Sequence, residues 1–190
     1  MIKTPTTNPP VPPAFLEERT QFLHDYGAFL AHWAEFELAV EVKIAKLTNL
    51  KPLDASIVLG SLNFGSKSNI LCSLLNEREE VALRSKIRSV TGHAKRNKLV
   101  HGAIASDLDD PRFAFIKREV GNEYVVDPHH FTAASFNKFF ERFRELTSEA
   151  LTAMGVAMQD IEDYGREARF FESDPQRPPS RRPDAAIGSK

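Results

Sequence analysis

The sequence predicts a mainly α-helical fold, a bundle of four to five helices with a short β-hairpin inserted before the last helix. Apolar residues recur every three or four positions along several long stretches, whereas one short stretch is rich in β-branched and aromatic residues. The chain has 190 residues, 42% of them hydrophobic, which is enough for one core. We therefore expect one domain at 14–171, between a flexible proline-rich segment at 1–13 and a disordered tail rich in proline and arginine at 172–190.

The first helix is expected over residues 14–47, where eight apolar side chains fall on one arc of a helix. These side chains are Phe22, Tyr26, Phe29, Trp33, Phe36, Val40, Ile44 and Leu47. Glu37 lies inside the same arc. A carboxylate among apolar side chains needs a partner, so Glu37 is expected to have one.

Two more helices are expected before the hairpin. Residues 53–76 form a helix that is interrupted near 60–65, and either Asn63 or Ser66 caps its second half. Residues 77–101 form the next helix, which Gly102 ends. Its apolar face consists of Leu83, Ile87, Val90 and Ala94.

The hairpin is expected at 113–117 and 124–126, with a turn around Gly121 and Asn122. After Thr132, a last helix carries an apolar stripe that continues to Ile161. The stripe comprises Phe136, Phe139, Phe140, Phe143, Leu146, Ala150, Met154, Ala157 and Ile161.

Composition argues against several classes of protein. A single cysteine, Cys72, precludes an internal disulfide and a cysteine-rich zinc site, and its neighbours favour a small buried apolar residue. No apolar run is long enough to span a membrane and no signal peptide is recognisable, so a cytoplasmic protein is expected. No glycine-rich phosphate loop, Ser-His-Asp arrangement or paired-carboxylate motif is present, and neither a metal nor a cofactor is expected.

Positive charge is concentrated in one segment, although the net charge of the chain is -1. Residues 81–106 contain no Asp or Glu. Their basic residues are Arg84, Lys86, Arg88, Lys95, Arg96 and Lys98. This segment either attracts phosphates or forms a solvated helix face whose charges pair with acidic residues elsewhere.

The same segment contains the run Arg96-Asn97-Lys98-Leu99-Val100-His101, followed by Gly102. This run resembles the signature of the HEPN family, helical domains with an Arg, four to six intervening residues and a His, and often a polar residue after the Arg. The resemblance extends to Trp33 with Glu37 on a long first helix, to the break at 64–67 and to the hairpin after the motif. It covers most of residues 14–162.

The resemblance implies a metal-independent endoribonuclease, acting as a toxin or in phage defence, that uses the ribose 2′-hydroxyl as nucleophile and leaves a 2′,3′-cyclic phosphate. Such cleavage needs a proton acceptor and stabilisation of the phosphorane charge. His101 suits proton transfer, because histidine titrates near neutrality, although a helix C-terminus would favour its cationic form. Arg96 suits the phosphate, and Asn97 could orient either group.

Helix geometry separates the two main catalytic candidates. Residues five apart on a regular helix point about 140° apart, so Arg96 and His101 do not share a face. Either His101 lies on an unwound terminal turn, or a second subunit completes the site. HEPN domains commonly dimerise with both motifs facing one cleft, so we favour a homodimer.

Further residues are assigned supporting roles. Lys95, Lys98 and His93 are candidate phosphate ligands. Glu37 could orient Arg96 or His101, or it could satisfy Lys67 or a backbone group. The expected partners are a second copy of the chain, RNA and an antitoxin protein, with no membrane. The alternatives are a HEPN-like module that binds RNA or a partner without cleaving, and an interaction scaffold in which Arg96 and His101 are structural.

Overall fold

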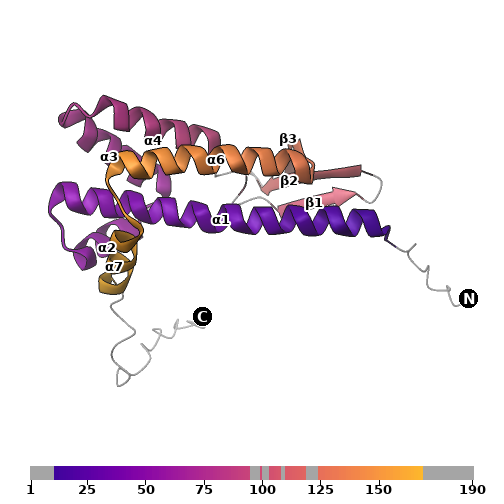
Figure 1. Ribbon diagram of the computed structural model, residues 1–190, viewed down its shortest axis with the longest axis horizontal. Helices are drawn as coiled ribbons and strands as arrows, with labels where there is room; N and C mark the ends of the chain where they lie inside the picture. Colours follow the sequence, from indigo (N-terminus) through magenta and orange to yellow (C-terminus); the bar gives the residue numbers. More distant parts are fainter. Residues whose placement is uncertain (1–10, 95–98, 100–102, 108–109, 119–123, 169–190) are drawn as a thin grey trace, which may run out of the picture.

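The computed structural model describes residues 11–168, apart from 95–98, 100–102, 108–109 and 119–123. Within these residues it is a helical bundle with a three-stranded antiparallel sheet at one end (Figure 1), which confirms the predicted fold class. The predicted flexible segment lies almost wholly outside the described residues, and the predicted tail lies outside them entirely.

Helix α1 (Pro13–Thr48) is the longest element and lies along the whole bundle, as Figure 1 shows. It confirms the predicted first helix. Proline fits the first turn of a helix, where its missing N–H is not needed, and the helix ends where Asn49 adopts a left-handed backbone with a φ of 55°. The apolar arc faces the core, since Phe22, Phe29 and Trp33 are all 3% exposed or less.

The predicted interruption separates helix α2 (Pro52–Gly60) from helix α3 (Phe64–Glu77). Asn63 is the cap, because its side-chain oxygen accepts a hydrogen bond of 2.9 Å from the backbone N–H of Ser66. Helix α4 (Val81–Ala94) begins four residues later than predicted. Its predicted apolar face is buried as expected.

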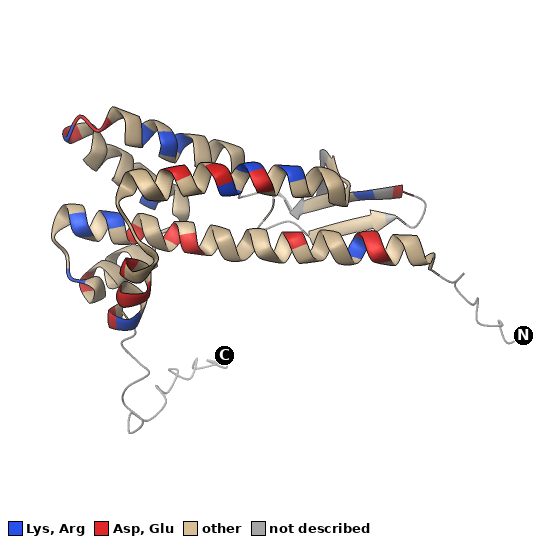
Figure 2. Cartoon of the chain, in the orientation of Figure 1, with Lys and Arg blue, Asp and Glu red and all other residues tan. Residues whose placement is uncertain are grey.

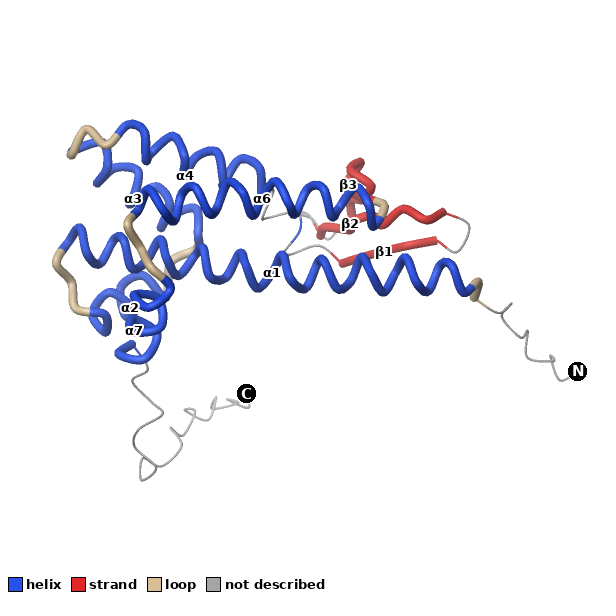
Figure 3. The backbone as a smooth tube through the Cα atoms, in the orientation of Figure 1, coloured by secondary structure: helices blue, strands red, loops and turns tan. Residues whose placement is uncertain are grey.

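The sheet is larger than the predicted hairpin. Strands β1 (Ala103–Asp107), β2 (Asp110–Arg118) and β3 (Tyr124–Phe131) form an antiparallel meander in that order (Figure 3). The hairpin is confirmed as β2 and β3, whereas β1 was not expected. Phe113 and Phe115 lie two positions apart on β2 and are both buried. Phe22 of α1 stacks on Phe113 with ring centroids 4.1 Å apart, so this face of the sheet packs against α1.

The prediction of a single last helix is wrong. Helix α6 (Ala133–Met154) ends at Gly155, which has a φ of 60°, and helix α7 (Met158–Ala168) follows. The N–H of Gly155 donates to the carbonyls of Leu151 and Thr152, as in a glycine-terminated helix. Ile161 is buried although it lies after the break, so the spacing of the apolar residues did not reveal the break. Helix α7 packs against α2 and the C-terminal part of α1.

Replacing Phe22 with alanine should lower the free energy of unfolding by about 3 to 5 kcal/mol, because a fully buried phenyl ring leaves a cavity between α1 and the sheet. Urea denaturation measures the change. Leu23→Ala is the matched control, since that neighbouring side chain is 42% exposed and its loss should change stability little. Equal losses in the two variants would contradict the orientation of α1.

Candidate functional site

The predicted motif lies between the end of α4 at Ala94 and the start of β1 at Ala103. Arg96, Asn97 and His101 lie outside the described residues, and so do Lys95 and Lys98. Their proposed roles therefore rest on the sequence.

One residue inside the motif is described. Leu99 is 2% exposed, and its carbonyl accepts a hydrogen bond of 2.5 Å from the Tyr26 hydroxyl of α1. Burial raises the pKa of Tyr26, which keeps its hydroxyl protonated as the donor. Beyond the motif, Ala103 pairs with Ile116 of β2. The chain is thus held against α1 within the motif and against the sheet just after it.

His93 is half-buried between α4 and α6. Its ring stacks on Phe139 with centroids 4.6 Å apart, and its Nε2 lies 3.0 Å from the Phe139 carbonyl oxygen. A carbonyl oxygen only accepts, so Nε2 carries the proton and donates. His93 therefore connects two helices, and a phosphate contact of the kind predicted would have to use Nδ1.

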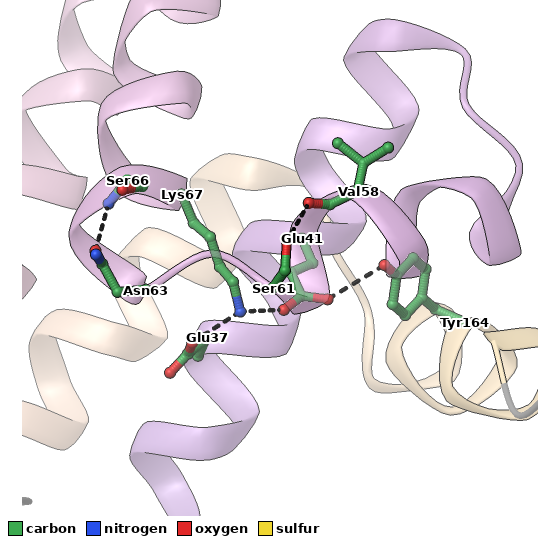
Figure 4. A network of polar contacts seen from close by, with 8 residues as sticks. All are labelled: Glu37, Glu41, Val58, Ser61, Asn63, Ser66, Lys67 and Tyr164. Carbon is green, nitrogen blue, oxygen red and sulfur yellow. Dashed lines mark hydrogen bonds and ion pairs between the residues drawn. The ribbon is translucent and has the colours of Figure 1, made fainter. Parts of the chain in front are cut away.

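Glu37 has the partner that its place in the apolar arc requires, as Figure 4 shows. The Nζ atom of Lys67 on α3 lies 2.9 Å from Oε1 of Glu37 and 2.6 Å from Oε1 of Glu41. The other carboxylate oxygen of Glu41, Oε2, accepts a hydrogen bond of 3.2 Å from the Tyr164 hydroxyl of α7. This polar cluster connects α1, α3 and α7, and the predicted pairing of Glu37 with Lys67 is confirmed.

Two pKa values reflect the electrostatics of the polar cluster. Burial disfavours the charge of Lys67, but hydrogen bonds to Glu41 and Glu37 outweigh this effect and raise its pKa above 10.5. Burial and the neighbouring Glu41 raise the pKa of Tyr164. Lys67 therefore remains an ammonium ion and Tyr164 a neutral donor, so the cluster is a rigid structural link at neutral pH.

Two residues of the polar cluster, Glu41 and Tyr164, were not predicted from the sequence. Glu41 follows Glu37 by four residues and so lies on the same face of α1, which was an available signal. Tyr164 gave none, because its contact depends on the break at Gly155 that lets α7 fold back.

The basic segment is partly neutralised where it is described. Lys86 pairs with Glu149 of α6 at 2.7 Å, and Arg84 donates to Asn76 of α3. Figure 2 shows that α4 carries Lys and Arg without Asp or Glu, whereas α6 carries both signs. The alternative in which the basic residues pair with acidic residues elsewhere is thus correct for Lys86, but not for every basic residue of α4.

Other classes of site find little support in the described part of the chain. It contains no group of three or more His, Cys, Asp or Glu side chains that could hold a metal ion. Cys72 is half-buried with a free thiol, rather than fully buried as expected. Among the described helices, none combines the length and the apolar character needed to cross a bilayer.

Comparisons with protein-family models, with curated proteins and with solved structures found no match to this chain.

Replacing Lys67 with methionine should lower the free energy of unfolding by about 3 kcal/mol or more, because it leaves Glu37 and Glu41 without the buried ammonium. Lys46→Met is the matched control, since Lys46 forms an ion pair with Asp160 that is largely exposed and should cost at most about 1 kcal/mol. Thermal and urea unfolding compare the two. Equally small losses would show that the polar cluster does not hold α3 and α7 to α1.

Proposed function

We propose that this chain is an endoribonuclease of the HEPN type that cleaves RNA without a metal ion. The observation that carries the proposal is the position of the Arg96–His101 motif. It directly follows a helix without acidic residues, and its Leu99 is buried with a carbonyl held by Tyr26. A segment that is held against the core at one residue can present its neighbouring side chains in a defined geometry.

The proposed reaction is an intramolecular transesterification. The ribose 2′-oxygen forms a bond to phosphorus, the bond from phosphorus to the 5′-oxygen breaks, and a 2′,3′-cyclic phosphate and a 5′-hydroxyl result. His101 transfers the proton, either from the attacking 2′-hydroxyl or to the leaving 5′-oxygen. Arg96 stabilises the negative charge that develops on the phosphorane oxygens, because a guanidinium stays charged and donates from two nitrogens.

Supporting residues complete the proposed site. Asn97 orients the imidazole or the phosphate by hydrogen bonding, and Lys95 and Lys98 attract the RNA backbone. Glu37 forms an ion pair with Lys67, so it would have to keep this ion pair while it orients Arg96 or His101. A homodimer would allow Arg96 of one chain to meet His101 of the other, which removes the obstacle that the two lie about 140° apart on a regular helix.

Arg96→Ala and His101→Ala should each lower the rate of RNA cleavage by about two to four orders of magnitude, the usual contribution of such groups. The assay uses labelled single-stranded RNA in EDTA and identifies the 2′,3′-cyclic phosphate ends. Arg142→Ala is the control, since Arg142 lies on the exposed face of α6 and pairs with Glu145. Circular dichroism verifies that all variants fold.

Two outcomes would contradict the proposal. Equal cleavage by wild type and both motif variants would assign the activity to another site or to a contaminant. Intact RNA that the wild type binds tightly would support the second candidate function, a HEPN-like RNA-binding module without catalysis.

A further inference from the structure

A polar groove runs between α3 and α4, away from the contacts of the proposed catalytic motif. Its volume is about 440 Å³. The side chains that line it and bear on its chemistry are Asn69, Ser73, Asn76, Glu77, Arg84 and Arg88. Cys72 also lines the groove, but none of the large apolar side chains that peptide-binding grooves use does.

The two arginines of the groove differ in their contacts. Arg84 is half-buried and held in place, because its guanidinium donates to the side-chain oxygen of Asn76. Arg88 is exposed, and its guanidinium forms no ion pair or hydrogen bond with any described residue. The two lie four positions apart, so their side chains neighbour each other on one face of α4. A fixed guanidinium beside an available one suits an anion with several oxygens.

Charge is distributed unevenly along the groove. The turn that joins α3 to α4 is short, so the helices are antiparallel, and the contact between Asn76 and Arg84 sets their alignment. Glu77, the acidic residue of the lining, therefore lies at the turn. Arg88 lies further along, opposite the part of α3 that carries Ser73 and Asn69. The positive end of the groove, which is lined by no acidic side chain, is the one nearer the C-terminus of α4.

We propose that the groove between α3 and α4 binds backbone phosphates of the single-stranded RNA that the motif cleaves. Arg88 contacts a phosphate directly, Arg84 supplies a second fixed charge, and Asn69 and Ser73 donate hydrogen bonds to phosphate or ribose oxygens. This inference rests on the proposed nuclease function and assigns the substrate path for it. Such contacts position the strand without selecting its sequence.

RNA is favoured over an acidic peptide because basic residues continue along the sequence from the groove to the proposed motif. In the sequence, Lys95 follows Arg88 by seven positions and Lys98 by ten, in a segment without carboxylates. A polyanion with evenly spaced phosphates suits a sequence in which basic residues recur from Arg84 to the proposed motif. The uniformly polar lining also suits a sugar-phosphate backbone better than side chains that need apolar pockets.

The test measures binding without cleavage. A fluorescein-labelled oligouridine with 2′-O-methyl groups cannot react, and its anisotropy gives the affinity between about 50 and 200 mM salt. Arg88→Ala should weaken binding about tenfold at low salt, the loss expected for one charge-assisted hydrogen bond. It should also reduce the slope of log affinity against log salt by about 0.7, the value for one contact to a single strand. Lys86→Ala is the matched control, because Lys86 lies on the same helix and pairs with Glu149.

The outcomes separate this inference from the function on which it rests. If the wild type binds the probe and cleaves RNA while Arg88→Ala matches Lys86→Ala in affinity and slope, the groove is excluded and the nuclease proposal stands. If the wild type neither binds the probe nor cleaves RNA, both fall. Displacement of the probe by poly-glutamate at the same charge concentration would reveal a general polyanion surface and overturn the assignment to RNA.

Discussion

The whole architecture depends on covering the apolar arc of α1. At 1.5 Å per residue its 36 residues extend about 54 Å, whereas the 22 residues of α6 cover only about 33 Å. No second helix of the described part matches α1 in length, so different elements bury different parts of the arc. Phe113 of the sheet covers Phe22, and Phe64 of α3 covers Trp33. Helices α2 and α7 pack near the C-terminal end of α1.

This division of α1 explains why the proposed chemistry lies where it does. Helix α4 ends at Ala94 and β1 begins at Ala103, and the motif lies between them in the sequence, where Leu99 is helical. Tyr26 holds the Leu99 carbonyl there, on the part of α1 that also contacts the sheet. Farther along α1, the ion pairs of Lys67 with Glu37 and Glu41 fix α3, the helix on which the polar groove is built. Rigid packing thus supports both ends of the proposed RNA path.

Periodicity alone predicted most of the helices and of their buried faces, since long amphipathic segments leave a strong signal, although Ala157 of the predicted last stripe is exposed. Strand β1 was missed because Ala103, Ala105 and Ser106 are small and lack the β-branched pattern of a strand; pairing with β2 defines it. The break at Gly155 was missed because the apolar stripe continues in register beyond it. In the site, the apolar surroundings of Glu37 on the first helix predicted that it needs a partner. The contact of Tyr164 with Glu41 could not be predicted, because it depends on the position of α7 after the break at Gly155.

The central claim is that one active site takes Arg96 from one chain and His101 from another, and mixing two inactive variants tests it most directly. In a symmetric dimer of Arg96→Ala with His101→Ala, one of the two shared sites keeps both intact residues. An equimolar mixture should therefore regain roughly a quarter of the wild-type cleavage rate, because half of the dimers are mixed and each has one intact site. A mixture as inactive as its two components would contradict the shared site.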